Sequence, residues 1–281
     1  MKHIDLYQSA PAIGMYGLAK YLGKPISHEP RAYPQLYGQS GYQSFSSEEE
    51  LFNFLEKLSS SINKKFRLSV ALDEKFIPFD IGNLAEDAHE HGELFVVDAR
   101  GLGPALINPF QWGSDLVLDY FDGSHFLIGP LLEDANDTRK EQDLYKLAMH
   151  HLQRERQSDT TKILLAYLSA HPKVEQVLHN SLYQDELMFK RNSKYFPRNI
   201  PNFFSFSLKN PLNRNFSHRF LTTKRIDSSN LLACIQRQSY ELKTVIYAIN
   251  TPTSSWDSHF VVIVGIEWIN DLVDAFEELL T

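Results

Sequence analysis

The stretch Ser-His-Phe-Val-Val-Ile-Val-Gly at residues 258–265 decides how this chain is expected to fold. It follows a β-branched run, Thr-Val-Ile-Tyr-Ala-Ile, at residues 244–249. Runs of this length that are rich in valine, isoleucine and phenylalanine are typical of buried strands. An apolar run at residues 231–238 predicts a helix before them, and an amphipathic pattern at residues 270–280 predicts a helix after them. The C-terminal part is therefore expected to form helix, strand, strand and helix.

The first half of the chain repeats this order. Residues 82–91 have a helical pattern that ends at Gly92, and residues 94–97 form a buried apolar run. Ser-His-Phe recurs at residues 124–126, where Leu-Ile-Gly follows it. A further strand is predicted at residues 116–120, ahead of an Asp-Gly turn. Either an internal duplication or a chance similarity explains this repetition.

The remaining segments are assigned from capping residues and periodicity. Ser47 and Glu50 fit a capping box at the start of an amphipathic helix over residues 47–62. Alternation predicts a strand at residues 66–72. Further helices are expected at residues 139–156, 160–170 and 174–189. The predicted organisation is an N-terminal half at residues 1–135, a helical connection at 136–190 and a C-terminal half at 191–281, or one continuous domain.

Composition excludes several classes of protein. With 43% hydrophobic and 12% aromatic residues, the chain can bury a core, which disordered proteins cannot. The single cysteine, Cys234, excludes an intramolecular disulfide and a cysteine-rich zinc site. No apolar run approaches the roughly 20 residues of a membrane span, and the N-terminal sequence lacks the apolar core of a signal peptide. We expect a soluble protein that is located in the cytoplasm or delivered into a host cytoplasm.

The net charge of −7 conceals one basic segment. Residues 187–226 contain no Asp or Glu, and their nine basic residues are interleaved with phenylalanine and tyrosine. The aromatic side chains are expected in the core, and the cations are expected to steer or bind an acidic protein partner. Nucleic acid is not expected as a partner, because the total charge is negative. The candidate binding residues are Lys194, Arg214, Arg219 and Arg225.

Two segments resemble papain-like cysteine peptidases of the bacteriocin-leader-processing, or double-glycine, type. The strand at residues 258–265 resembles the segment that carries the histidine base of that family. Ser-Ala-Pro-Ala at residues 9–12, with Tyr-Leu-Gly at residues 21–23, resembles the helix that carries its nucleophilic cysteine. The resemblance implies an α+β fold with a papain-like core, in which an N-terminal helix packs on an antiparallel sheet, and an additional helical and basic lobe.

The resemblance places Ser9 where the family has its cysteine. A cysteine at a helix N-terminus is acidified by the helix dipole and by free N–H groups, whereas a serine hydroxyl is not. Ser9 is therefore either the replacement of a catalytic cysteine or the mark of an inactive scaffold, and it also fits a plain N-cap. Gln8 is the candidate for the oxyanion-binding glutamine, although the family places that residue several positions earlier.

Two histidines are candidates for the catalytic base. His259 has the better local motif, and His125 lies closer to Ser9 along the chain. In such a site a third residue orients the imidazole through its second nitrogen. Asn270 or Asp271 is the candidate for this role after His259, although a helix is predicted there where the family usually has a strand.

Other chemistry has little support in the sequence. Cys234 lies in an apolar helical run, where a free cysteine is typically buried and inert. His-Glu-His at residues 89–91 and the adjacent His150 and His151 lack the spacing of a helical zinc site. Gly-Leu-Gly-Pro at residues 101–104 lacks the other residues of a phosphate-binding loop. We therefore expect no metal and no cofactor.

These features lead to two hypotheses about function. The first is a papain-like thiol hydrolase or acyltransferase, whose substrate is a peptide, a protein or an acyl group and whose reaction is cleavage, deamidation or acyl transfer. The second is a catalytically inactive papain-like domain that binds an acidic partner through residues 187–226.

Overall fold

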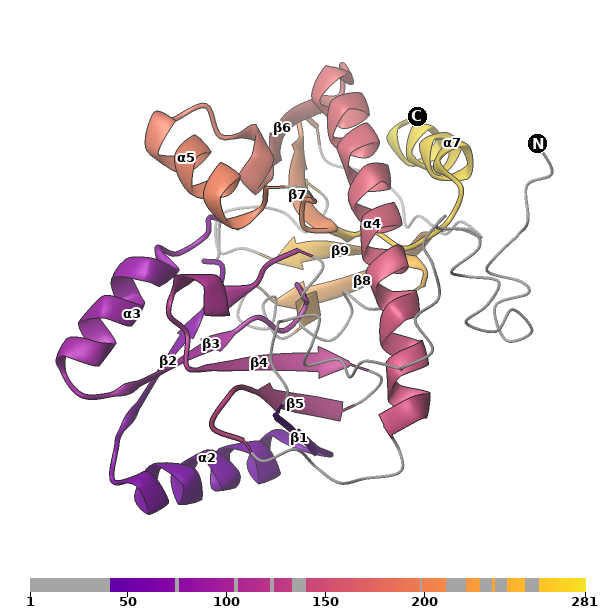
Figure 1. Cartoon of the computed structure of the whole chain (residues 1–281). Helices are drawn as coiled ribbons and strands as arrows, with labels where there is room; N and C mark the ends of the chain where they lie inside the picture. The colour runs from indigo at the N-terminus through magenta and orange to yellow at the C-terminus, as the bar shows by residue number, and fades with distance from the viewer. Residues whose placement is uncertain are drawn as a thin grey trace, which may run out of the picture.

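The computed structural model describes residues 41–73, 76–103, 106–121, 124–132, 140–197, 199–210, 221–227, 234–235, 242–250 and 258–281. Its strands form two five-stranded sheets, with the orders β1-β5-β4-β3-β2 and β6-β7-β10-β9-β8. The first sheet comes from the first half of the chain and the second sheet from the second half (Figure 1). In the described ranges, no helix has the length and apolar character needed to span a membrane.

The first sheet contains both parallel and antiparallel strand pairs. Strands β2, β3 and β4 are parallel to one another, whereas β5 is antiparallel to both β4 and β1. Parallel neighbours need a crossover connection, and helix α3 provides it between β2 and β3. The elements are β1 (Tyr42–Phe45), β2 (Phe66–Val70), α3 (Ile81–Glu90), β3 (Leu94–Asp98), the 3₁₀ helix η2 (Pro109–Trp112), β4 (Leu116–Phe121) and β5 (Ser124–Ile128).

The second sheet repeats part of this pairing. Strands β8 and β9 are parallel, β10 lies antiparallel between β9 and β7, and β6 pairs with β7 across a bulge. Ser-His-Phe therefore introduces a strand with two antiparallel neighbours in each sheet, β5 in the first and β10 in the second. The strands are β6 (Val174–Leu178), β7 (Phe203–Leu208), β8 (Leu221–Asp227), β9 (Thr244–Asn250) and β10 (His259–Ile263).

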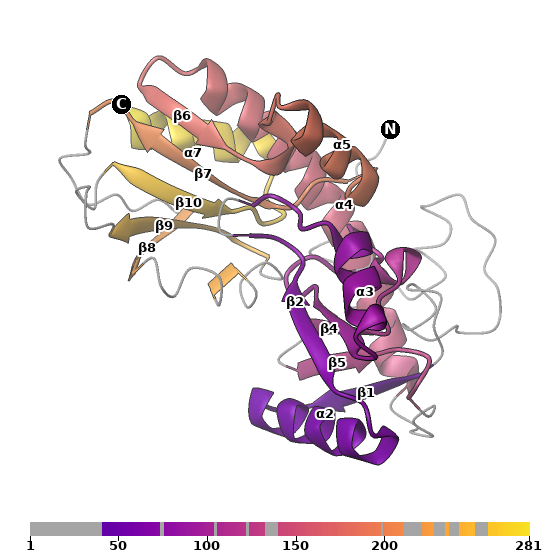
Figure 2. The ribbon, with the colours of Figure 1, turned by 90° about the vertical axis from the view of Figure 1, so that its left-hand side faces the viewer.

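Helices cover the outer faces of both sheets. Figure 2 shows α2 below the first sheet, and α4 with α7 on the far side of the second sheet. A shorter helix, α5, follows β6 and a 3₁₀ turn, η3. The bounds are α2 (Glu48–Ile62), α4 (Lys140–Ala170), η3 (Asn180–Leu182), α5 (Glu186–Tyr195) and α7 (Ile269–Leu280).

The alternation of side chains along the strands divides the core into three clusters. On β3, Phe95 and Val97 join a central cluster, whereas Val96 packs under α2. On β10, Val261 and Ile263 join the same central cluster, whereas Val262 packs under α4 and α7. The central cluster therefore contains residues of both sheets and of α3, and it holds the two halves of the described chain together.

Helix α2 confirms the expected helix over residues 47–62. Ser47 is its N-cap and accepts a hydrogen bond from Glu50 N at 3.2 Å. The Glu50 carboxylate accepts from Ser46 N at 2.9 Å rather than from Ser47. A hydrogen bond from the Ser46 side chain is the main cause that lowers the pKa of Glu50. The helix ends at Asn63, whose left-handed backbone (φ 54°) asparagine tolerates better than most residues.

Several expectations from the sequence are wrong. The sheets are mixed rather than antiparallel, so the fold is of the α/β class and not α+β. Residues 174–189 do not form one helix: residues 174–178 pair with β7 as a strand, and α5 begins only at Glu186. The helices expected at 139–156 and 160–170 are one continuous helix, α4.

Candidate functional site

The carboxyl ends of β2 and β3 meet at one edge of the first sheet, because the two strands are parallel and in register. Asp98 is the last residue of β3 and lies opposite Val70. The chain continues from the two strands through Asp73 and Arg100 at this carboxyl edge. In open α/β sheets ligands bind outside the carboxyl ends of the strands, so these side chains are the first candidates for a site.

Arg100 is held between two carboxylates. Its Nε donates to Asp98 Oδ1 at 2.9 Å, and its Nη2 donates to Asp98 Oδ2 at 2.6 Å. Its Nη1 donates to Glu48 Oε1 at 2.5 Å, from the first turn of α2. Burial by itself would lower the pKa of Arg100, but the hydrogen bonds and charges of Asp98 and Glu48 outweigh it and raise that pKa above its usual value. The guanidinium is therefore permanently charged and fixed in direction.

A pocket opens next to this ion cluster. Its volume is about 20 Å³, which is room for about one water molecule or for a charged end group of similar size. Asp73 lies in its wall together with Asp98 and Arg100, so both signs of charge reach the pocket. The remaining lining residues are apolar: Val70, Ala71, Leu72, Phe76, Leu102, Phe203 and Ile235.

Phe76 forms part of the apolar wall in an unusual conformation. Its φ is +64°, a region that a bulky side chain rarely adopts. Its side chain is buried, and its ring centroid lies 5.3 Å from that of Phe203. The packing of the ring between the two sheets thus holds a backbone conformation that costs free energy, and such residues cluster at functional sites.

The acidic side of the pocket includes Asp73. Its Oδ1 accepts a hydrogen bond from Ile77 N at 2.8 Å, which orients the carboxylate. Burial raises the pKa of the nearby Tyr183 hydroxyl, and the charge of Asp73 raises it further. The Tyr183 side chain thus remains a neutral hydroxyl beside a charged carboxylate.

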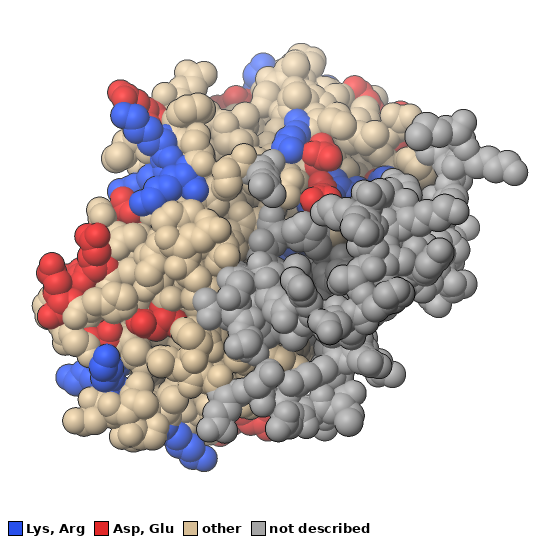
Figure 3. All heavy atoms as spheres, viewed as in Figure 1, with Lys and Arg blue, Asp and Glu red and all other residues tan. Residues whose placement is uncertain are grey.

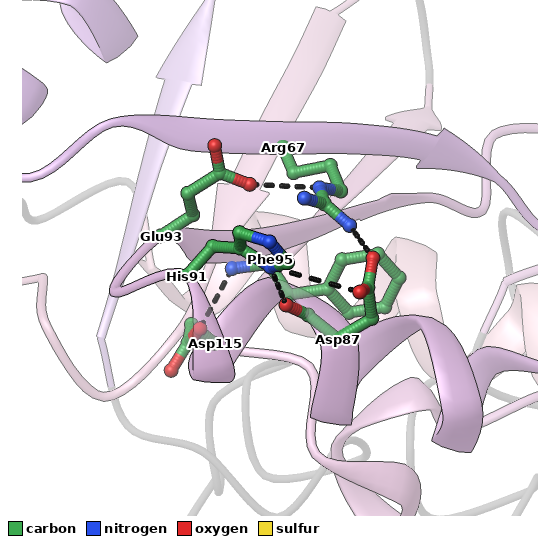
Figure 4. A network of polar contacts seen from close by, with 6 residues as sticks. All are labelled: Arg67, Asp87, His91, Glu93, Phe95 and Asp115. Atoms are coloured by element: carbon green, nitrogen blue, oxygen red, sulfur yellow. Dashed lines mark hydrogen bonds and ion pairs between the residues drawn. The ribbon is translucent and has the colours of Figure 1, made fainter.

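A second charge cluster lies at the opposite, amino edge of the same sheet (Figure 4). Arg67 donates from Nε to Glu93 Oε2 at 2.7 Å and from Nη1 to Asp87. Asp115 Oδ2 accepts from Phe95 N at 2.7 Å, at the start of β3. The Arg67 guanidinium is more exposed than that of Arg100, with 31% of the side chain exposed against 9%.

The structure separates the residues that the papain-like hypothesis brought together. Ser9 and Gln8 lie outside the described residues. His125 is buried on β5 and faces α2, with its ring 4.9 Å from that of Tyr120. His259 is exposed at the start of β10 and faces away from α4 and α7, with Nδ1 3.0 Å from Ser258 Oγ. The two histidines thus belong to different sheets and different layers.

Asp271 belongs to a different element from His259. It is in the first turn of α7, after the end of β10, whereas His259 is the first residue of β10. Strand β10 itself is roughly 13 Å long from His259 to its carboxyl end. Cys234 is half-buried against the central cluster, and its neighbour Ile235 lines the pocket.

The structure also separates the residues of the expected basic surface. Arg214 and Arg219 lie outside the described residues. Lys194 is on α5, where its Nζ lies 3.4 Å from Asp80 Oδ1, and Arg225 is exposed on β8, the edge strand of the second sheet. Five aromatic residues of this segment are in the core, as expected, namely Tyr195, Phe196, Phe203, Phe204 and Phe206, whereas Phe189 is 61% exposed.

The fold is similar to that of solved pyridoxal-phosphate-dependent enzymes of sulfur amino-acid metabolism. Similar structures include cystathionine γ-synthase from Xanthomonas oryzae pv. oryzae (16% identity, TM-score 0.58) and O-acetylhomoserine sulfhydrylase from Wolinella succinogenes (15%, 0.62). A protein assigned as O-acetylhomoserine (thiol)-lyase from Campylobacter jejuni is also similar (14%, 0.60). Each alignment covers 88% of this chain, and 83%, 94% and 83% of the respective structures. No family model and no curated protein sequence matches the chain.

These similarities overturn the papain-like interpretation. The local patterns at residues 9–23 and 258–265 resemble a cysteine peptidase, but 88% of the chain aligns with structures of a different fold. The hypotheses of a thiol hydrolase or acyltransferase and of an inactive papain-like binding domain are therefore wrong. At 14–16% identity the similarity extends to the fold and not to the activity.

The cofactor of these enzymes does not fit the described residues. Such enzymes hold pyridoxal phosphate through a lysine Schiff base, and the Campylobacter structure contains a pyridoxyl-lysine. Every lysine side chain that the structure describes here is exposed. One of them, Lys194, has its pKa raised, first by its hydrogen bond to Tyr195, whereas a Schiff-base lysine needs a lowered pKa. The described ranges also contain no group of three or more metal-ligating side chains.

Sequence reasoning missed the carboxyl-edge residues. Asp98 and Arg100 directly follow the buried run at residues 94–97, so a charged pair after a buried strand was the available signal. Glu48 and Asp73 come from other segments, and only the parallel pairing of β2 with β3 and the packing of α2 bring them to the same edge.

Proposed function

We propose that this chain binds a small zwitterionic molecule of the amino-acid class at the carboxyl edge of the first sheet. The observation that carries the proposal is the Arg100 guanidinium in the pocket wall. Arginine has five N–H donors, and the hydrogen bonds to Asp98 and Glu48 use three of them. The other two can donate to a ligand carboxylate, which arginine recognises in a planar, directed geometry.

The pocket wall also contains groups that can bind the ammonium group of such a ligand. Among the described residues, the carboxylates of Asp73 and Asp98 lie in the pocket wall together with the Arg100 guanidinium. The resulting negative potential favours a cationic group, and the rings of Phe76 and Phe203 offer π faces that attract an ammonium group. A ligand with both an ammonium and a carboxylate group matches this arrangement better than a simple anion or a simple cation.

The similar structures provide a second line of support. The Xanthomonas enzyme was crystallised with aminoacrylate and cysteine, and the names of the others refer to homoserine derivatives. The proposal transfers only this class of ligand. Since the pocket admits one small end group, the rest of the ligand would lie outside the pocket, in contact with solvent.

Calorimetric titration with matched ligands tests the proposal. L-methionine and L-cysteine should bind, whereas 4-(methylthio)butanoate, which lacks the amine, and L-methioninamide, which lacks the carboxylate, should bind at least about tenfold more weakly. Equal affinity for L-methioninamide and L-methionine would show that Arg100 does not recognise the ligand carboxylate. Absence of any heat or competition with either amino acid at millimolar concentration would contradict the proposal as a whole.

A further inference from the structure

The pocket at the carboxyl edge is small, and its apolar walls are deeply buried. Its volume of about 20 Å³ holds about one water molecule. Four of the apolar side chains that line it are only 2–4% exposed, namely Phe76, Leu102, Phe203 and Ile235. Close-packed walls of this kind yield little space to an additional methyl group. The pocket therefore limits which end of an amino acid can enter it.

The two charged groups of an amino acid differ in size. An ammonium group has a single non-hydrogen atom, as water has, whereas a carboxylate group has three. Space for about one water molecule therefore suits the ammonium group better than the carboxylate group. On size alone, the ammonium group is the end that enters.

The charges of the wall favour the same end. Among the described residues that line the pocket, Asp73 and Asp98 contribute two carboxylates and Arg100 contributes one guanidinium. The Asp73 carboxylate is held in place, because its Oδ1 accepts a hydrogen bond from Ile77 N at 2.8 Å. A wall with more negative than positive groups attracts a cation more strongly than an anion. Size and charge thus both select the ammonium group.

The exposed charges of α5 and α3 offer no such selection. Figure 3 shows side chains of both signs next to one another over these two helices. Lys190 with Glu186 and Lys194 with Asp80 form exposed ion pairs there, and exposed pairs interact weakly in water. Charges at an open surface cannot distinguish a primary ammonium group from a methylated one, because no wall surrounds the nitrogen.

We propose that the pocket takes the ammonium group of its ligand and selects primary α-amino acids over N-methylated ones. This inference rests on the proposed function and adds the orientation of the ligand. The ammonium group lies in the pocket, the carboxylate lies against Arg100, and the side chain extends outside the pocket into solvent. A methyl group on the nitrogen then has no room, whereas a longer side chain is tolerated. The ligand class is therefore primary α-amino acids, including those with large side chains.

Calorimetric titration of the wild-type full chain tests the orientation. L-methionine and S-benzyl-L-cysteine should bind within about threefold of each other, whereas N-methyl-L-methionine should bind at least about tenfold more weakly than L-methionine. Equal affinity for the N-methylated ligand, or loss of binding with the benzyl group, would overturn this inference and leave the proposed function intact. Absence of binding by L-methionine itself would refute the proposed function, and this inference with it.

A matched pair of variants tests the fit of the nitrogen. Ile235→Val removes one methyl group from the pocket wall, and N-methyl-L-methionine adds one. The preference for L-methionine over its N-methyl form should therefore fall at least about threefold in this variant. The control Ile249→Val changes a side chain that is buried in the same central cluster but does not line the pocket, and it should keep the wild-type preference. An unchanged preference in Ile235→Val, or an equal fall in both variants, would overturn the inference.

Discussion

The two edges of the first sheet hold the same chemical group in different surroundings. At the carboxyl edge, Arg100 lies between two carboxylates, is 9% exposed and lines a pocket. At the amino edge, Arg67 also lies between two carboxylates, but it is 31% exposed and contacts solvent (Figure 4). Exposed ion pairs contribute little to stability, whereas removing one partner of a buried pair leaves a charge that water cannot solvate. We therefore expect the Arg67 cluster to contribute little to stability, and we place the proposed ligand site at the Arg100 cluster.

The largest expected effect is the loss of stability when the arginine of the buried cluster is replaced. Arg100→Met leaves the 3% exposed Asp98 side chain without its guanidinium, so the free energy of unfolding should fall by about 3–5 kcal/mol. Arg67→Met should cause a much smaller change, because its partners remain hydrated. Urea denaturation of the two variants and the wild type measures both effects. Equal losses would show that burial does not distinguish the two edges.

The contrast between buried and exposed ionisable groups extends to the histidines. His89, beside the amino edge, has a 44% exposed side chain, whereas His179 is 1% exposed. Burial lowers the pKa of His179 to about 4, against a partly opposing hydrogen bond to the Pro201 carbonyl. Since the unfolded chain then binds the proton more tightly than the folded one, stability is lost as the pH falls from about 6.5 to about 4.

Between pH 7 and pH 5 the loss from His179 alone amounts to about 2 kcal/mol. The difference between the urea midpoints at pH 7 and pH 5 should therefore be smaller in His179→Gln than in the wild type. An undiminished pH dependence in His179→Gln would show that another group carries it.

A smaller effect tests the strained wall of the pocket. Phe76→Ala should destabilise the protein, because a buried aromatic side chain is lost. Phe76→Gly should cost about 1 kcal/mol less than Phe76→Ala, since glycine adopts φ +64° without strain. At Phe79, which lacks a positive φ, glycine should instead be worse than alanine. Thermal unfolding of the four variants gives the comparison, and the same order at both positions would contradict the strain.

The sequence predicted many elements correctly, because hydrophobic periodicity is a local property. The strand expected at 94–97 is β3, and the helix expected at 270–280 is α7. The prediction at 174–189 failed since the hydrogen bonds of β6 come from β7, a distant segment whose pairing overrides local helix propensity. The fold class failed for the same reason: Ser-His-Phe at 258–260 specifies the start of a strand, but not which strands become its neighbours.

The candidate site was less predictable than the fold. A catalytic interpretation of His125 and His259 rested on short motifs, and the chain places them in different sheets. Arg100 has no recognisable motif, because its partners Asp98 and Glu48 are separated along the chain by 50 residues and meet only when α2 packs on the first sheet. Such a site becomes visible only from the packing of the elements.

The measurement that tests the central claim most directly is a titration of wild-type, Arg100→Lys and Arg67→Lys proteins with L-methionine by isothermal calorimetry. Lysine keeps the positive charge but loses the planar set of donors. Binding should weaken at least about tenfold in Arg100→Lys and remain at the wild-type value in Arg67→Lys, with both variants folded by circular dichroism. Wild-type affinity in Arg100→Lys, or an equal loss in both variants, would contradict a ligand site at the carboxyl edge.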